Sequence, residues 1–210
     1  NLKATFKFPY ENTGSANALR VEKLSVGYGH PLLAPVTFSM TMGEKLLFTG
    51  FNGVGKSTLI KSILKKIPAL GGTATFSPSA KVNYFDQDLE WDDPSLTPLQ
   101  MIQNMFPTMQ PKTIRQKLAR AGINAANTMK PLHLLSGGEQ TKVKLAILEL
   151  TPSNFLIMDE PTNHLDDETK EGLKTALQNF PGNLILVSHE QSFYEGWLDK
   201  ILNVEKLSLK

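Results

Sequence analysis

Apolar and polar residues follow two distinct rhythms along the chain. Strand-like stretches, most of them alternating with a period of two, occur at 19–26, 32–40, 45–49, 73–77 and 81–85. Two later runs, FLIM at 155–158 and LILV at 184–187, are apolar at every position. Continuous apolar strands are typical of a parallel sheet that is covered on both faces. We therefore expect a mainly parallel sheet that contains these two runs.

Apolar residues with helical spacing begin after residue 56. Apolar residues at 59, 60, 63, 64 and 67 fall on one helical face, and Pro68 predicts that the helix ends at residue 67. Asp166 or Asp167 can cap a later helix that runs to about residue 180. Alternating strands and helices indicate an α/β fold.

The stretch 88–135 differs from the rest because it is rich in proline and has helical segments between the prolines. Thr97-Pro98 and Gln110-Pro111 read as helix starts, since proline is favoured at the first helical position. Gly122 reads as a helix stop. We interpret this stretch as a helical subdomain inserted into the sheet domain.

Composition and charge narrow the function only a little. The 210 residues, 40% of them apolar, suffice for one good core or two small ones, and the lack of cysteine excludes disulfides and thiolate metal sites. No apolar run approaches the length of a membrane span. A net charge of +2 is too small to indicate nucleic acid by itself.

The string GFNGVGKS at 50–57, followed by Thr58, matches the phosphate-binding loop G-x-x-x-x-G-K-[ST] between a predicted strand and a predicted helix. Its glycines let backbone N–H groups turn toward phosphate oxygens, and the helix N-terminus adds partial positive charge. Lys56 would bridge the β- and γ-phosphates and Ser57 would hold Mg²⁺. The alternative is an ordinary glycine-rich turn. The predicted nucleotide ligands here are Gly50, Asn52, Gly53, Val54, Gly55, Lys56, Ser57 and Thr58.

Two adjacent carboxylates end the first apolar run, which reads FLIMDE at 155–160. Buried charges without a partner are costly, so a strand of this kind indicates a bound cation. Asp159 is the expected Mg²⁺-side acid, and Glu160 is the candidate general base for water. The alternative is an exposed Asp-Glu turn. His189 follows the second apolar run and could donate to the γ-phosphate, although a lone histidine is more often structural.

A pair of glycines precedes another helix-like run in LSGGEQ at 135–140. The ordered set of motifs, phosphate loop, LSGGEQ, FLIMDE and then Ser-His, resembles the ATP-binding-cassette (ABC) ATPases over about residues 18–210. The resemblance implies a P-loop NTPase fold with an N-terminal antiparallel β subdomain and an inserted helical subdomain. It also implies that Gln87 touches Mg²⁺ or the attacking water, and that Tyr28 stacks on adenine.

The same resemblance implies that the LSGGEQ signature binds the γ-phosphate of ATP held by another cassette. Ser136 and the N–H groups of two glycines at a helix start would form that anion site. The chain would then hold two half-sites and hydrolyse ATP when paired head to tail with a second cassette. The residues that the resemblance assigns to nucleotide contact here are Ser136, Gly137, Gly138, Glu139 and Asp166.

The string PTNHLD at 161–166 resembles the ABC-F subgroup, whose members are soluble, carry two cassettes and bind ribosomes. Only a short stretch separates Lys56 from Gln87, without room for the arm of a first cassette, and the sequence begins with Asn rather than Met. We therefore expect a second cassette, with residues 1–17 as a linker remnant and 18–210 as the ABC domain. Its core would be 18–87 and 151–210, and its helical subdomain about 88–150.

The resemblance also implies ATP and Mg²⁺ as ligands, the ribosome as a partner and a cytoplasmic location. Two other classes share part of this sequence pattern: the motor subunit of a membrane ABC transporter, and a non-enzymatic module with ATP as a structural ligand. Glu160 and His189 argue against the second.

Glu190-Gln191 departs from the Asp-Arg that usually follows the family histidine. The basic residues Lys112, Arg115, Lys117 and Arg120 could meet RNA phosphates, but they spread around their helix and favour a solvated face.

Overall fold

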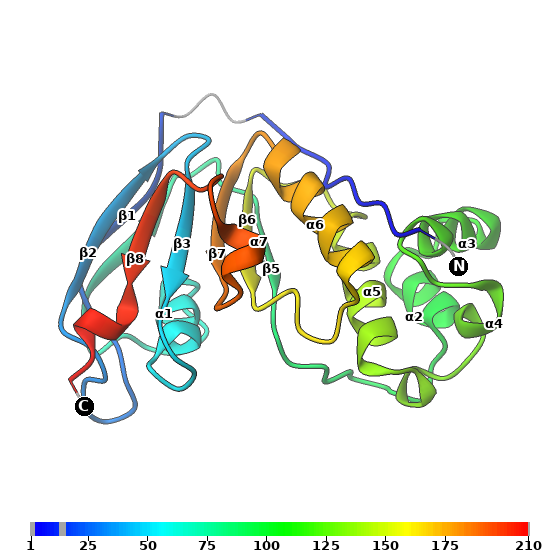
Figure 1. Ribbon diagram of the computed structural model, residues 1–210, viewed down its shortest axis with the longest axis horizontal. Helices are drawn as coiled ribbons and strands as arrows, with labels where there is room; N and C mark the ends of the chain where they lie inside the picture. Colours follow the sequence, from blue (N-terminus) through cyan, green and yellow to red (C-terminus); the bar gives the residue numbers. More distant parts are fainter. Residues whose placement is uncertain (1–2, 13–15, 210) are drawn as a thin grey trace. The chain divides into compact units, whose positions relative to one another are not determined.

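The computed structural model describes residues 3–12 and 16–209, and Figure 1 labels its helices and strands. The chain folds into two compact units. The sheet unit comprises Tyr10–Asn83, Ser153–Glu160 and Pro181–Lys210, and the helical unit comprises Asn1–Pro9, Tyr84–Pro152 and Pro161–Phe180. The predicted division at residues 18, 87 and 151 stays a prediction. Residues 1–2 and 13–15 of the predicted linker remnant lie outside the described residues.

The central sheet has five strands in the order β5-β6-β7-β3-β8. The pairs β6–β7, β3–β7 and β3–β8 are parallel, as the apolar runs predicted. Every residue of β6 and β7 is buried. The strands are β3 (Lys45–Thr49), β5 (Val82–Phe85), β6 (Phe155–Asp159), β7 (Asn183–Val187) and β8 (Lys200–Asn203).

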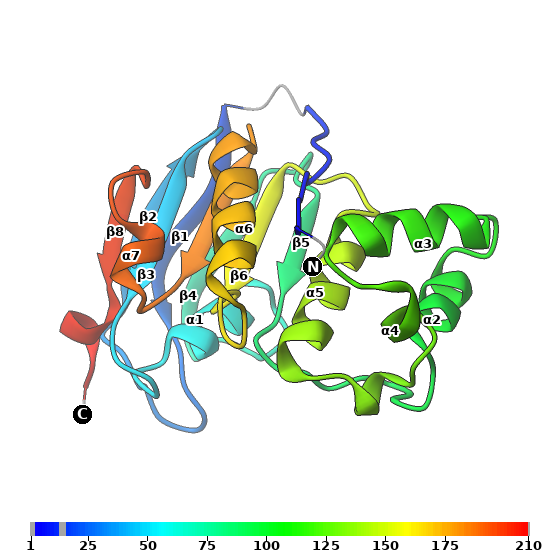
Figure 2. The same cartoon turned by 45° about the vertical axis from the view of Figure 1, so that its right-hand side comes forward.

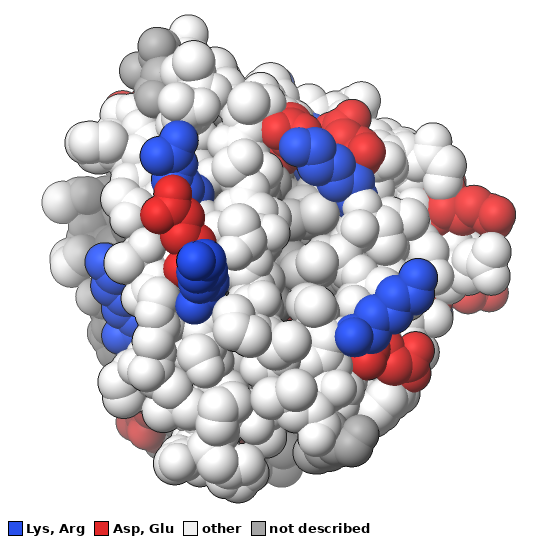
Figure 3. Space-filling model, turned by 90° about the vertical axis from the view of Figure 1, so that its left-hand side faces the viewer, with Lys and Arg blue, Asp and Glu red and all other residues white. Residues whose placement is uncertain are grey.

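A second sheet of the same unit is antiparallel, with the order β2-β1-β4. It consists of β1 (Asn17–Ser25), β2 (Val36–Thr41) and β4 (Gly71–Phe76). The strand predicted at 32–40 was placed too early, because β2 begins after Pro35. On the face shown in Figure 3, acidic and basic side chains lie next to each other. In the sheet unit, Lys200 Nζ lies 2.9 Å from Oε2 of Glu44.

The sheet unit also contains α1 (Lys56–Ile63), α7 (Gln191–Tyr194) and the 3₁₀ turn η2 (Val204–Leu207). The prediction that α1 extends to residue 67 was wrong. Lys65 adopts φ 60°, and the N–H of Lys66 donates to the Lys61 carbonyl at 2.9 Å. This left-handed closing turn ends the helix before Pro68 can do so.

The helical unit is built from α2 (Pro98–Met105), α3 (Pro111–Arg120), α4 (Ala125–Thr128), η1 (Leu132–Leu134), α5 (Gly137–Leu148) and α6 (Asp167–Asn179). The predicted starts of α2 and α3 are confirmed, and each has proline in its first turn. Asp166 caps α6 by accepting the Thr169 N–H at 2.7 Å. Gly122, with φ 91°, follows the end of α3. Buried apolar side chains such as Ile114 and Leu118 form the core of this unit.

Candidate functional site

The glycine-rich loop between β3 and α1 has the backbone that a phosphate cradle needs. Gly50, Gly53 and Gly55 have φ of 144°, 84° and 119°, a region that side chains with a Cβ rarely adopt. Gly55 is the N-cap of α1, and no side chain caps the helix there. The N-cap residue thus places no side chain over the first turn of α1, and the N-terminus of this helix is suited to an anion.

Lys56, the first residue of α1, is 5% exposed. Its ammonium group donates to the Gly50 carbonyl at the start of the same loop. It also lies 3.6 Å from Oε1 of Glu160. The cation is thus held inside the cradle by one carbonyl and one carboxylate.

Ser57 and Asp159 meet across the sheet unit. The Ser57 hydroxyl donates to Oδ2 of Asp159 at 2.8 Å, and Asp159 is fully buried. A hydroxyl and a carboxylate are hard oxygen donors of the kind that Mg²⁺ prefers, with phosphate and water completing its shell. In the described part of the chain, no group of three or more His, Cys, Asp or Glu side chains could by itself hold a metal ion. A site of few protein ligands fits Mg²⁺ bound together with a nucleotide.

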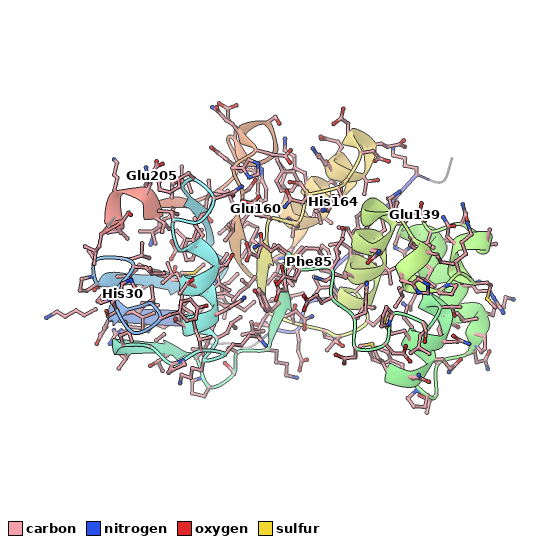
Figure 4. All side chains as sticks on the ribbon, turned by 90° about the horizontal axis from the view of Figure 1, so that it is seen from below. His30, Phe85, Glu139, Glu160, His164 and Glu205 are labelled. Carbon is pink, nitrogen blue, oxygen red and sulfur yellow. The ribbon has the colours of Figure 1, made fainter. Side chains whose placement is uncertain are left out.

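Glu160 lies directly after β6, where Figure 4 labels it, and is 4% exposed. Its N–H donates to the Val187 carbonyl at 2.9 Å, which ties it to the end of β7. Nδ1 of His189 lies 3.0 Å from Oε1 and 3.1 Å from Oε2 of the same carboxylate. The sequence placed Glu160 and His189 each after an apolar run, and the structure brings the two side chains into direct contact.

Tyr28 belongs to the same unit and sits in a turn where Gly27 bridges to Pro31. The ring is 61% exposed and is therefore available to stack on a flat ligand. Close to this turn, Leu33 packs against the loop, because a Cβ on Gly55 would lie 3.5 Å from the Leu33 side chain. Leu33 was not among the predicted site residues, since an apolar residue in a strand-like stretch carries no distinguishing signal.

In the helical unit, Ser136 is the N-cap of α5, and its hydroxyl accepts the Glu139 N–H at 3.2 Å. The two glycines of the signature lie against the turn that contains His164, which Figure 4 labels. A Cβ on Gly138 would lie 2.5 Å from the His164 carbonyl oxygen, and one on Gly137 would lie 3.0 Å from the His164 ring. His164 itself has φ 68°. This packing partner was missed, because backbone conformation and close approach leave no mark in the sequence pattern.

The remaining predicted site residues of the helical unit are Gln87 and Asp166. Gln87 is an exposed residue in the segment after β5. Hydrogen bonds from the hydroxyl and N–H of Thr169 keep the pKa of the Asp166 carboxyl below its usual value. Lys142 of α5 lies 4.0 Å from this carboxylate. Nucleotide contact by either residue stays a prediction, and the geometry gives Asp166 a capping role.

The fold and the cradle together define a P-loop nucleotide-binding protein of the α/β class. The family model described as ABC transporter matches residues 33–163. The chain therefore belongs to the ABC transporter family, as an ATP-binding cassette domain. Domains of this kind bind ATP, typically with Mg²⁺, generally act as ATPases and work as pairs.

Curated relatives extend this similarity over most of the chain. YdiF of Bacillus subtilis is 37% identical over 203 residues, which are 96% of this chain and 32% of that protein. Human ATP-binding cassette sub-family F member 3 is 36% identical over 165 residues, which are 78% of this chain and 23% of that protein. The chain thus spans about a third or less of the length of these two relatives.

Solved structures share the fold. A chain from Pyrococcus furiosus described as an ABC transporter ATP-binding protein matches with TM-score 0.72 and 24% identity, over 90% of this chain and 98% of that one. CbiO1 of Clostridium perfringens, part of an ABC transporter complex, matches with TM-score 0.66 and 22% identity, over 90% and 86% of the two chains. Among the described residues, no helix is long and apolar enough to cross a membrane.

Proposed function

We propose that this chain is a cassette of the ABC-F type that hydrolyses ATP to ADP and phosphate when paired with a second cassette, and that the pair acts on the ribosome. The observation that carries the ATPase part is the buried Glu160 carboxylate. It lies within hydrogen-bond distance of His189 and 3.6 Å from the lysine of the phosphate cradle. Burying a carboxylate costs free energy, and a scaffold that binds no nucleotide would have no need to bury Glu160 in this way.

Binding begins with an exchange of partners at Lys56. The Lys56 ammonium group is held by the Gly50 carbonyl and by Glu160. The β- and γ-phosphates of ATP take over this cation, while N–H groups at the start of α1 donate to their oxygens. Mg²⁺ bound beside Ser57 and Asp159 would neutralise charge on the phosphate oxygens. The exchange also frees the Glu160 carboxylate from its ion pair.

Glu160 then serves as the general base. A water oxygen attacks the γ-phosphorus, its proton passes to the Glu160 carboxylate, and the bond from the γ-phosphorus to the β,γ-bridging oxygen breaks. Nδ1 of His189 holds the carboxylate by a hydrogen bond, and so fixes the direction in which it accepts the proton. Tyr28, in the same unit, completes the site by stacking on the adenine.

The signature of the partner completes each site. Ser136 and the N–H groups of Gly137 and Gly138 form the start of α5, which carries no basic side chain in its first turn. The helix start supplies neutral donors for a γ-phosphate bound by the other cassette. Hydrolysis removes this bridge and opens the pair.

Two observations support the ABC-F and ribosome part. PTNHLD follows Glu160 directly, and its His164 packs on the signature glycines, so the subgroup motif contacts the proposed half-site. The human relative at 36% identity is named as a sub-family F member. The solved neighbours, at 24% identity or less, bear on the fold alone.

The proposal predicts that Glu160→Gln keeps ATP binding, lowers turnover by at least about a hundredfold and traps closed pairs. We would sediment this variant with ribosomes and, separately, with membrane vesicles, in ATP and in ADP. ATP-dependent pelleting with ribosomes is the expected result. Lys56→Ala is the matched control, and it should neither bind ATP nor pellet. Pelleting with membranes alone would replace the ribosome proposal with the transporter alternative. Wild-type turnover in Glu160→Gln would remove the residue from the base role.

A further inference from the structure

The segment at residues 3–9, which we name the strap, lies on the helical unit in an extended conformation. Figure 2 shows it in dark blue, ending beside α5 and α3. Every second side chain is buried: Ala4, Phe6 and Phe8 are at most 8% exposed, and the side chains between them are exposed. The rings of Phe6 and Phe8 stack with their planes 4° apart. This alternation is the pattern of a strand that docks by one face.

The backbone of the strap is anchored at two further points. The N–H of Thr5 donates to the Arg120 carbonyl, the last of α3, at 2.7 Å. The N–H of Lys7 donates to the carboxylate of Glu149, which is the C-cap of α5. These two hydrogen bonds fix the register of the strap on α3 and α5. In an undocked strap, both N–H groups would donate to water instead.

Two glycines make room for the strap. A Cβ on Gly172, in the middle of α6, would lie 2.6 Å from the Ala4 carbonyl oxygen. A Cβ on Gly122 would lie 3.2 Å from Cβ of Ala4. A glycine inside a helix lowers helix stability relative to alanine, so Gly172 is unfavourable for α6 alone. The close approach of the strap explains why residue 172 is a glycine.

We propose that the strap fastens the N-terminal segment of this chain to the C-terminal end of α5, and that α5 transmits the position of the strap to the signature. The helix has 12 residues, from Gly137 to Leu148, and is about 18 Å long. Ser136 caps its N-terminal end and Glu149 its C-terminal end. A displacement of the strap therefore pulls on the same rigid element that presents the half-site. The transmission part of this inference rests on the proposed function of the signature.

The docking of the strap can be tested without ATP. In Gly172→Ala, the added methyl overlaps the Ala4 carbonyl while α6 gains a better helix former. We expect tryptic cleavage of the Lys7–Phe8 bond to rise about tenfold, with the helical content unchanged. Gln178→Ala, an exposed change on the same helix, is the control and should cleave at the wild-type rate. Equal cleavage in both variants would overturn the inference.

A second measurement cross-links the strap to position 122 after α3, where the introduced cysteine must accept φ 91°. The chain contains no cysteine, so an introduced pair gives an unambiguous thiol count. Cβ atoms at positions 4 and 122 are close to disulfide range. We expect Ala4→Cys with Gly122→Cys to lose its free thiols on mild oxidation, and each single variant to keep one. Two persistent thiols in the folded double variant would mean that the strap is not docked.

Transmission is tested by turnover. Gly172→Ala is expected to lower ATP turnover several-fold at saturating ATP, while nucleotide affinity stays at the wild-type value because the P-loop lies in the other unit. Oxidation of the cysteine pair should leave turnover no lower than in its reduced form. If Gly172→Ala raises cleavage of the Lys7–Phe8 bond but hydrolyses ATP at the wild-type rate, the strap does not transmit its position to the signature. Absence of turnover in the wild type would instead count against the proposed function, and the cleavage assay would remain readable.

Discussion

Glu160 occupies the left-handed region of the backbone, with φ 49°, although it carries a full side chain. Such a conformation costs free energy and persists where the surroundings fix it. Here the surroundings are the Val187 carbonyl on the backbone side, and His189 and Lys56 on the carboxylate side. The turn that begins at this residue separates β6 from the PTNHLD segment, and it lets the carboxylate face the cradle instead of continuing the strand.

A second carboxylate, Glu149, gives a pH-dependent prediction. Burial raises its pKa from 4.5 to about 7, against the opposing effects of the Lys7 N–H, Arg120 and Lys117. Because the raised pKa means that the folded state holds this proton more tightly, the resulting stability is complete below pH 4.5 and is lost as the pH rises through 7. The side chain is only partly buried, so we expect a loss on the order of 1 kcal/mol between pH 5 and pH 8.

Glu149→Gln should abolish that loss. Urea unfolding of the variant and the wild type at pH 5, 6, 7 and 8 is the measurement, and the difference in the free energy of unfolding should grow with pH in favour of the variant. Glu171→Gln, at an exposed position of α6, serves as the matched control. A difference that stays constant with pH would contradict the assignment.

At the scale of elements, two helices with the same kind of start differ in one interaction. Thr97 caps α2 through a complete capping box: its hydroxyl accepts the Gln100 N–H at 3.1 Å, and the Gln100 side chain accepts the Thr97 N–H at 3.0 Å. Gln110 precedes α3 without any side-chain cap. Both helices have proline in the first turn, so the pair isolates the value of the box.

We therefore predict that Thr97→Ala lowers the free energy of unfolding by about 1 to 2 kcal/mol, and Gln110→Ala by less than about 0.5 kcal/mol. Denaturant midpoints with unchanged slopes would measure both changes. Equal effects of the two substitutions would show that the box contributes nothing beyond the proline and the helix propensity.

Local signals also explain which elements the sequence could predict. Prolines at 98 and 111, the aspartate at 166 and the continuous apolar runs each act within a few residues, and the elements they predicted are present. The end of α1 was missed because Lys65 adopts a left-handed conformation that usually belongs to glycine. The docking of residues 3–9 was missed for a different reason: its partners are distant in sequence, and a polar-rich terminal segment resembles a linker. The same limit applies to the contact between His189 and Glu160, which the two apolar runs that precede these residues did not predict.

At the scale of the whole molecule, each proposed site combines a P-loop from one chain with a signature from another. A two-fold pair would hold two equivalent sites of this kind. Ser136→Arg damages the signature half, and Lys56→Ala damages the P-loop half. A mixed pair of the two variants therefore keeps one intact site.

We expect each variant alone to be inactive, and an equal mixture to recover between about a quarter and a half of wild-type ATP turnover. Turnover of the separate and mixed proteins is the measurement, with thermal unfolding of each variant as the check on folding. If the mixture stays inactive while both variants are folded, hydrolysis does not use composite sites. Activity of Ser136→Arg alone at the wild-type level would lead to the same conclusion.

The contact between Gly138 and the His164 carbonyl links two short motifs that lie far apart in the sequence. A methyl group at the first position has no space while the second keeps its backbone course. We expect the two motifs to change together in evolution, because a change in either requires a compensating change in the other. Hybrid cassettes assembled from different relatives should therefore keep LSGGEQ and PTNHLD from the same parent.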